Sequence, residues 1–100
     1  MIDGTATFRV RPEAVERCLG AIREFVDHVE KNEPRTKLYA LWRDRDDPTR
    51  FIHLMVFEDQ AAEQTHSSSG AVKRFTDVLY PETVDGVTFR GFDLVAGTGL

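Results

Sequence analysis

The stretch that most limits how this chain can fold is the apolar run from Phe51 to Phe57. It reads FIHLMVF, and His53 is its single polar member. Seven residues suit a strand better than a helix, and phenylalanine, isoleucine and valine all favour strands. Because the side chains of a strand alternate between two faces, an unbroken apolar run requires cover on both faces. The sequence therefore predicts a central strand that is buried on each side.

The residues after this strand predict a helix that is broken once. Glu58-Asp59 can cap a helix and place negative charge at its start, and residues 61–64 carry the helix onward. A serine- and glycine-rich segment, residues 67–70, predicts a break within the helical range 59–80. His66 stands where the first helical piece meets this break. A central strand that feeds a broken helix, with a histidine at the break, is one way to wall a pocket.

Hydrophobic periodicity predicts the remaining elements. These are strands over residues 5–10, 37–43 and 87–95, and a helix over residues 12–32. Gly91 in the last strand suggests a bulge or a close approach of two chain segments. The short polar loop that contains Asp47-Pro48 joins two strands, so those strands are expected to pair as an antiparallel hairpin.

The predicted order is strand, helix, strand, strand, helix, strand. Right-handed crossovers fold this order into an α+β ferredoxin-like sandwich, with both helices on one face of a four-stranded antiparallel sheet. We expect residues 1–100 to form one domain. A single helix layer covers only one sheet face, so the apolar strand predicts a homodimer that buries the other face.

Charge and cysteine content argue against several classes of protein. The 100 residues carry a net charge of −4, which argues against binding to nucleic acid or to an anionic membrane. Cys18 is the single cysteine, so an intramolecular disulfide is excluded and a reducing compartment is expected. The sequence has neither an apolar run of membrane-spanning length nor the basic start of a secretory signal. We therefore expect a cytoplasmic protein.

Between Leu38 and Phe75 the sequence resembles one known family. The resemblance lies in the hairpin from Tyr39 to Phe51, the strand end Phe57-Glu58-Asp59, the alanine-rich helix that reaches His66, and the Ser69 to Phe75 spacing. In this ordered combination the chain resembles the antibiotic biosynthesis monooxygenase-like proteins. These proteins are dimeric α/β-barrels that include small quinol and anthrone monooxygenases.

The resemblance implies a cofactor-independent protein that oxidises a hydroxylated aromatic, a quinol or a polyketide with dioxygen. Dioxygen reacts poorly with closed-shell carbon, so such an enzyme must first make an electron-rich phenolate or enolate. His66 is the candidate base, since an imidazole can accept a proton near neutral pH. The alternative for His66 is structural: its ring would cap the helical piece and tie down the serine segment.

Five other residues are candidate contacts of an aromatic ligand: His53, Tyr39, Trp42, Phe57 and Phe75. His53 lies in an apolar strand, where a neutral imidazole needs a partner, and it is a second candidate base. The three scattered histidines and Cys18 lack metal-ligand spacing, so no metal site is predicted. Relatives often have a glutamate and then a tryptophan where this chain has Met55 and Phe57. These apolar residues favour the alternative function, a non-catalytic dimeric module that binds a small aromatic.

Overall fold

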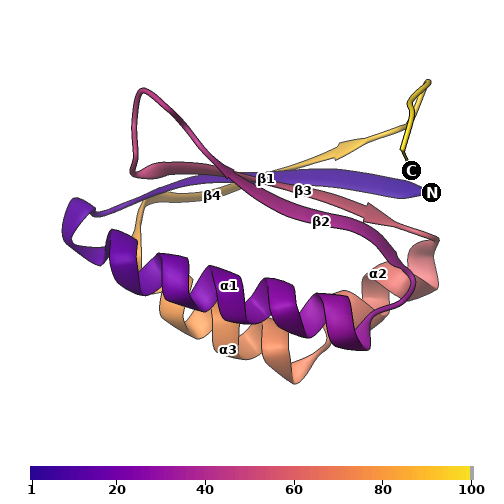
Figure 1. Cartoon of the computed structure of the whole chain (residues 1–100), viewed down its shortest axis with the longest axis horizontal. Coiled ribbons are helices and arrows are strands. Elements are labelled where there is room, and N and C mark those ends of the chain that lie inside the picture. The colour runs from indigo at the N-terminus through magenta and orange to yellow at the C-terminus, as the bar shows by residue number, and fades with distance from the viewer. Residues whose placement is uncertain (100) are drawn as a thin grey trace.

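A computed structural model describes residues 1–99, whose helices and strands follow the order that the sequence predicts (Figure 1). The elements are β1 Ile2–Val10, α1 Val15–Asn32, β2 Thr36–Arg43, β3 Arg50–Phe57, α2 Gln60–Ser67, α3 Gly70–Leu79 and β4 Thr83–Phe92. Two short 3₁₀ turns, Pro12–Ala14 and Tyr80–Glu82, precede α1 and β4. The helix predicted over 12–32 thus begins with a 3₁₀ turn rather than a regular helical one.

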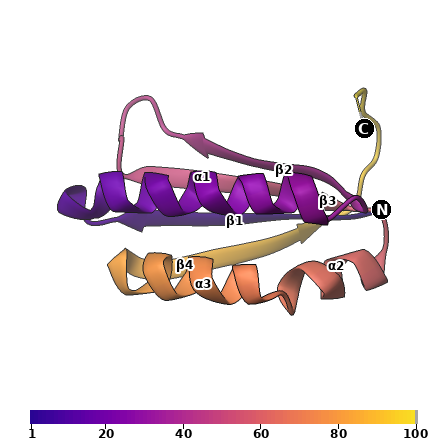
Figure 2. The same ribbon diagram turned by 60° about the horizontal axis from the view of Figure 1, so that its bottom comes forward.

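The four strands form one antiparallel sheet in the order β2-β3-β1-β4. All the helices lie on the same face of this sheet, with α1 running beside α3 (Figure 1, Figure 2). The predicted α+β ferredoxin-like fold is therefore confirmed. Strand β3 has a neighbour on each edge, as expected for the strand that carries the apolar run.

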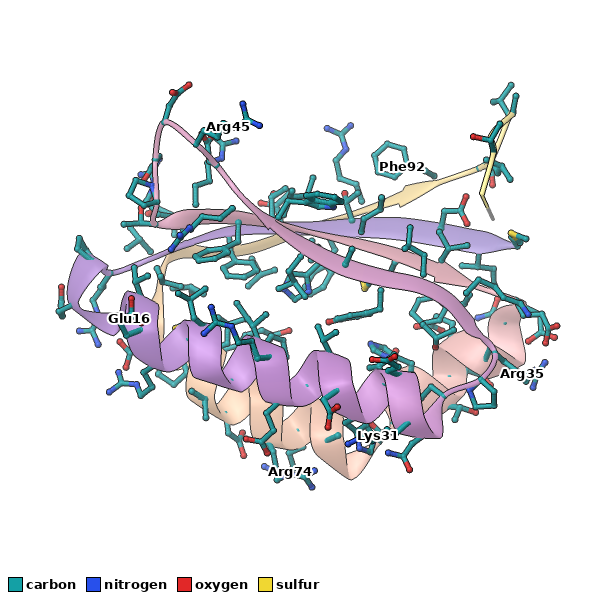
Figure 3. The ribbon with its side chains drawn as sticks, viewed as in Figure 1. Glu16, Lys31, Arg35, Arg45, Arg74 and Phe92 are labelled. Atoms are coloured by element: carbon teal, nitrogen blue, oxygen red, sulfur yellow. The ribbon has the colours of Figure 1, made fainter. Side chains whose placement is uncertain are left out.

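The core fills the space between the helix layer and the sheet (Figure 3). Helix α1 buries one stripe at three- and four-residue steps, made of Cys18, Ile22, Phe25 and Val29. This stripe belongs to the same buried cluster as Phe8 and Val10 of β1, Phe51 of β3, and Ala71, Phe75 and Leu79 of α3. Cys18 is fully buried in this cluster, as its place on the apolar stripe predicts.

The break in the second helical region has a local cause. At the start of α2, the Asp59 side chain accepts a hydrogen bond from the Ala62 backbone N–H, at 2.9 Å. At the start of α3, the Ser69 side chain accepts one from the Val72 backbone N–H, at 3.1 Å. Each helix therefore has its own N-cap. The predicted break is confirmed, and it leaves His66 in the last turn of α2.

Strand β4 differs from the prediction in both its ends and its irregularity. It runs over Thr83–Phe92 rather than 87–95. Arg9 pairs with Val84 while Phe8 pairs with Val87, so two residues of β4 bulge out between these pairs. Both bulged residues, Asp85 and Gly86, have positive φ, 65° and 76°. Left-handed backbone here, rather than the glycine at position 91, makes the bulge.

The helix-free sheet face exposes several large apolar side chains. Trp42 is 61% exposed, its cross-strand partner Ile52 is 38% exposed, and Phe92 is 52% exposed. Figure 3 shows Phe92 on the side of the sheet away from the helices. None of the helices within residues 1–99 is long and apolar enough to cross a membrane.

Candidate functional site

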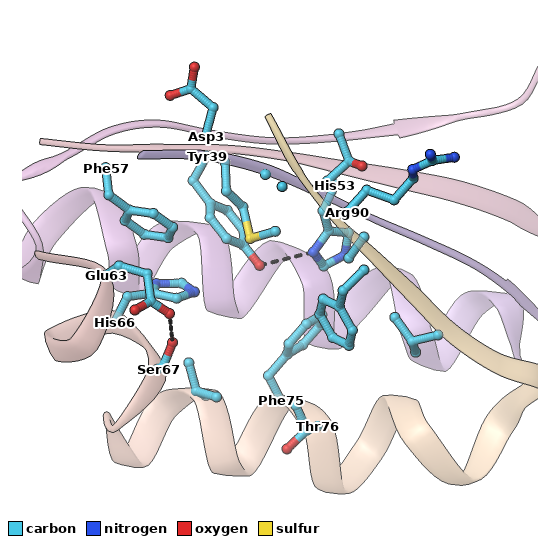
Figure 4. A pocket seen from close by; sticks show the side chains of 18 of the residues that line it. Asp3, Tyr39, His53, Phe57, Glu63, His66, Ser67, Phe75, Thr76 and Arg90 are labelled. Carbon is cyan, nitrogen blue, oxygen red and sulfur yellow. Dashed lines mark hydrogen bonds between the residues drawn. The ribbon is translucent and has the colours of Figure 1, made fainter. Parts of the chain in front are cut away.

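A cavity of about 600 Å³ opens between the helix-facing side of the sheet and the helices α2 and α3 (Figure 4). Its walls are mainly apolar and aromatic, and they include Phe8, Phe25, Phe57, Phe75 and Phe89. A few polar side chains also line it, among them Tyr39, His53 and His66. An apolar cavity of this size with a few convergent polar groups is typical of a small-molecule site.

Packed aromatic rings hold the polar groups of the cavity in place. Phe25 of α1 and Phe75 of α3 stack with their ring centroids 4.7 Å apart, and Tyr39 meets Phe25 edge-on at 5.3 Å. The Tyr39 ring lies between the two histidines, with centroid distances of 5.7 Å to His53 and 5.2 Å to His66. Such contacts fix ring orientation, because edge-to-face and offset-stacked pairs are preferred.

His66 is hydrogen-bonded to a buried carboxylate. Its Nδ1 lies 2.8 Å from Oε1 of Glu33, and the two residues are only 6% and 7% exposed. The Thr36 hydroxyl donates to the same carboxylate oxygen at 3.0 Å. A carboxylate oxygen can only accept, so Nδ1 of His66 donates, and in the neutral form of the ring Nε2 holds the lone pair. Glu33 therefore fixes both the tautomer and the orientation of the ring, as a carboxylate does in many base sites.

Glu33 was not predicted as a site residue. It follows α1 directly and precedes Pro34, so the sequence shows it only as the place where the helix ends. Its backbone N–H still donates to the Val29 carbonyl at 2.9 Å, and its carbonyl accepts from the Thr36 N–H at 3.0 Å. These bonds point the side chain of a helix-terminal residue into the core, 33 positions before its partner His66.

The structure gives the His66 ring a partner other than the serine segment. The ring bonds to Glu33 rather than to the serine segment. That segment is held by its own side chains: the Ser68 hydroxyl donates to the Gln64 carbonyl at 2.7 Å, and Ser69 caps α3. The ring is therefore not needed to close the helix, and it lines the cavity instead.

His53 and Tyr39 form a second polar pair. Nδ1 of His53 lies 3.1 Å from the Tyr39 hydroxyl. Burial, and then the nearby His66, lowers the pKa of His53 from 6.5 to about 3, so its ring is neutral at ordinary pH. Burial, and then Glu33, raises the pKa of Tyr39 well above its usual range, so Tyr39 keeps its phenolic proton. Within residues 1–99, Nε2 of His53 is buried without a hydrogen-bond partner.

The structure brings five of the six predicted site residues to one cavity. His66, His53, Tyr39, Phe57 and Phe75 all line it. Trp42 does not, because it points to the helix-free face, where it lies beside Thr7 and Arg43. Adjacent residues of a strand face opposite ways, so Tyr39 and Trp42 cannot share one face. Trp42 is therefore corrected to a residue of the outer sheet surface.

No metal cluster accompanies the cavity. Within the described part of the chain, residues 1–99, no three His, Cys, Asp or Glu side chains are grouped so that they could hold a metal ion.

The fold and the cavity define a ferredoxin-like α+β protein with an aromatic small-molecule site. The sequence profile of the antibiotic biosynthesis monooxygenase family matches residues 1–78. The chain belongs to this family. No curated protein shows a significant sequence match.

Solved structures agree in fold. An antibiotic biosynthesis monooxygenase of known structure is 26% identical, with a TM-score of 0.88, over 96% of this chain and 100% of that one. A candidate monooxygenase of the same kind from Caulobacter crescentus is 20% identical, with a TM-score of 0.88, over 95% and 90% of the two chains. Another from Nitrosomonas europaea is 16% identical, with a TM-score of 0.89, over 96% and 100%.

The depressed pKa of His53 predicts a specific loss of stability in acid. The unfolded chain takes up a proton at His53 below about pH 6.5, whereas the folded site resists protonation down to about pH 3. Acid therefore favours the unfolded state, by up to about 1.4 kcal/mol for each pH unit below 6.5. His53→Phe should remove this part of the slope. Urea unfolding of both proteins between pH 6.5 and 5 measures it, and parallel slopes would show that His53 is not held neutral by the fold.

Proposed function

We propose that this protein is a cofactor-independent monooxygenase that oxidises a hydroxylated aromatic, a quinol or a polyketide with dioxygen. The observation that carries the proposal is His66, whose Nδ1 is held by the buried Glu33 at the wall of an aromatic cavity. Family membership supports the same class of reaction.

The proposed reaction begins with proton transfer to His66. Nε2 accepts the proton of a ligand hydroxyl, and the positive charge that forms on the ring is stabilised by the Glu33 carboxylate. The resulting phenolate or enolate is electron-rich and can pass an electron to dioxygen. One oxygen atom then enters the product and the other leaves as water. Because the proposal includes no cofactor, the substrate itself supplies the electrons and protons for that water.

The cavity suits this chemistry in two ways. Its mainly apolar walls lower the local dielectric constant, which strengthens the electrostatic effect of each polar group inside. Its volume of about 600 Å³ falls within the usual range for sites that enclose a small organic molecule. Phe25, Phe57 and Phe75 offer flat surfaces against which an aromatic ligand can pack.

A second candidate function is a non-catalytic module that binds a small aromatic. Met55 and Phe57 favour it, because they place apolar side chains on the cavity wall. Tyr39 and His53 favour it as well, since burial keeps both in their neutral forms. His66 favours the monooxygenase, because it is a histidine with a carboxylate partner on one nitrogen and the cavity beside its ring.

His66→Ala should decide between these functions. If His66 is the base, the change should lower oxygen uptake by about 10²–10⁴-fold, because that is the usual effect of losing a positioned general base. Activity of the unchanged protein should also fall in acid, since only neutral imidazole accepts a proton. Oxygen consumption with a panel of reduced quinols and anthrones measures both effects. His28→Ala is the matched control, because His28 lies on α1 outside the lining of the cavity, and among residues 1–99 only Asn32 bonds to it.

Two results would contradict the proposal. Turnover that survives His66→Ala would reject His66 as the base. Absence of oxygen uptake by the unchanged protein on every substrate tried would favour the binding module, and titration of the same compounds would then measure their affinities.

We further propose that the protein is a homodimer that buries the helix-free sheet face. Trp42, Ile52 and Phe92 are exposed on this face in the single chain. Trp42 and Ile52 are cross-strand neighbours, and Phe92 lies further along the same face. Exposed apolar surface on one sheet face can mark an interaction surface, and a two-fold dimer would cover the same face on both copies. One domain of residues 1–100 per subunit is part of this proposal.

Light scattering should give about twice the chain mass of 11.4 kDa at micromolar concentration. Trp42→Glu should shift the mass toward that of one chain, because it places a charge in the proposed interface. Arg74→Glu is the control, since Figure 3 shows Arg74 on the helix side, away from this face. A single-chain mass for the unchanged protein, or a dimer that survives Trp42→Glu, would contradict the proposed interface.

A further inference from the structure

We propose that the cavity binds its ligand between two histidines of opposite hydrogen-bonding polarity. Nε2 of His66 accepts from a ligand hydroxyl, and Nε2 of His53 donates to a ligand carbonyl oxygen. The ligand class is therefore an aromatic in which a hydroxyl and a carbonyl are conjugated through the ring. This inference rests on the proposed function, because it assigns the substrate features that the same site recognises.

The polarity of His66 follows from Glu33. A neutral imidazole carries one proton and one lone pair. The carboxylate oxygen of Glu33, 2.8 Å from Nδ1, can only accept, so the proton is on Nδ1. The lone pair is then on Nε2, and the His66 ring lines the cavity. This end of the site accepts hydrogen bonds.

The polarity of His53 follows from Tyr39, and it is the reverse. Tyr39 has one proton to donate, and Nδ1 of His53 lies 3.1 Å from its oxygen. If Tyr39 donates, Nδ1 accepts and the His53 proton is on Nε2. The opposite arrangement would leave the Tyr39 proton and the Nε2 lone pair both without partners, and phenol oxygen is a poorer acceptor than imidazole nitrogen. Tyr39 therefore donates, and Nε2 of His53 is a donor.

This donor is one of three buried side-chain atoms within residues 1–99 that have no hydrogen-bond partner; the other two, Oδ1 of Asp3 and Oε2 of Glu33, are acceptors. His53 is 4% exposed and lines the cavity, and within residues 1–99 its Nε2 has no hydrogen-bond partner. A buried donor without a partner destabilises the protein, and native structures rarely leave one without a reason. Figure 4 shows the His53 ring beside the cavity, joined to the Tyr39 hydroxyl by one nitrogen only. A ligand oxygen that accepts from Nε2 satisfies it.

The lone pair of His66 and the N–H group of His53 together suit the transfer of one proton from the ligand to His66. The ligand O–H bond breaks as His66 Nε2 takes the proton, and the electron pair left on oxygen delocalises through the ring to the carbonyl oxygen. His53 then stabilises the charge that develops there by donating a hydrogen bond. Because burial keeps His53 neutral, it stabilises this oxygen without protonating it, whereas an imidazolium would return a proton and quench the anion. The anion stays electron-rich, as reaction with dioxygen requires.

The test compares three probes of similar shape. Para-hydroxyacetophenone carries both groups, para-ethylphenol carries the hydroxyl alone, and acetophenone carries the carbonyl alone. The unchanged protein should bind para-hydroxyacetophenone about tenfold more tightly than either of the others, since each lacks one hydrogen bond to a buried partner. The absorbance of bound para-hydroxyacetophenone should also shift toward that of its phenolate.

Variants locate the preference at His53. His53→Phe keeps a flat ring but removes the donor, so it should bring the ratio of the affinities for para-hydroxyacetophenone and para-ethylphenol close to one. His53→Gln, whose amide can still donate, should retain part of the ratio. Tyr39→Phe should reduce it, because the tautomer of His53 is then no longer fixed. Since the unchanged protein supplies the ratio by itself, a variant that fails to fold does not remove the test.

Equal affinities for the two phenols in the unchanged protein, or a ratio that persists in His53→Phe, would overturn the inference. So would failure to bind any of the three probes. These outcomes are distinct from failure of the proposed function. A clear binding preference without oxygen uptake on any substrate rejects the monooxygenase alone, and oxygen uptake without the preference rejects this assignment alone.

Discussion

The burial of His53 inside an otherwise apolar strand is the constraint on which this site depends. Every other residue of the run from Phe51 to Phe57 is apolar, and the helix layer covers its inner face. An imidazole in that setting cannot carry charge, and it needs a hydrogen-bond partner. Tyr39, on the neighbouring strand β2, supplies one. The sheet pairing of β2 with β3 that builds the core therefore also fixes a neutral donor in the cavity.

His66 has the opposite role because it has a different partner. A carboxylate rather than a phenol meets its Nδ1, and that carboxylate comes from the end of α1. Two chemically identical side chains in one cavity thus present a lone pair and a proton. Tyr39 lies between them and contacts both rings. The separation of acceptor and donor depends on this packing, and the proposed reaction uses both: one to remove a proton, the other to stabilise the charge that results.

The sequence is sufficient to predict the helices and strands and five of the residues that line the cavity. Apolar residues that recur every second position predict the strands, and those that recur every third or fourth position predict the helices. The alternation of side chains along β2 already places Tyr39 and Trp42 on opposite faces of the sheet. The sequence is not sufficient for Glu33, which lies 33 positions from His66 and meets it only through tertiary packing. The β4 bulge does have a sequence signal, because an Asp-Gly dipeptide such as Asp85-Gly86 favours left-handed backbone; the predicted strand begins after it, at residue 87, and Gly91 is the misleading position.

The most direct test of this account is the tautomeric state of the two cavity histidines. Nitrogen-15 NMR of the labelled, unchanged protein at neutral pH distinguishes a proton on Nδ1 from one on Nε2, and His53→Phe assigns the signals. We predict that His66 carries its proton on Nδ1 and His53 on Nε2, each in a single tautomer. The same tautomer in both rings, or exchange between tautomers in either, would contradict the assignment of one acceptor and one donor to this cavity.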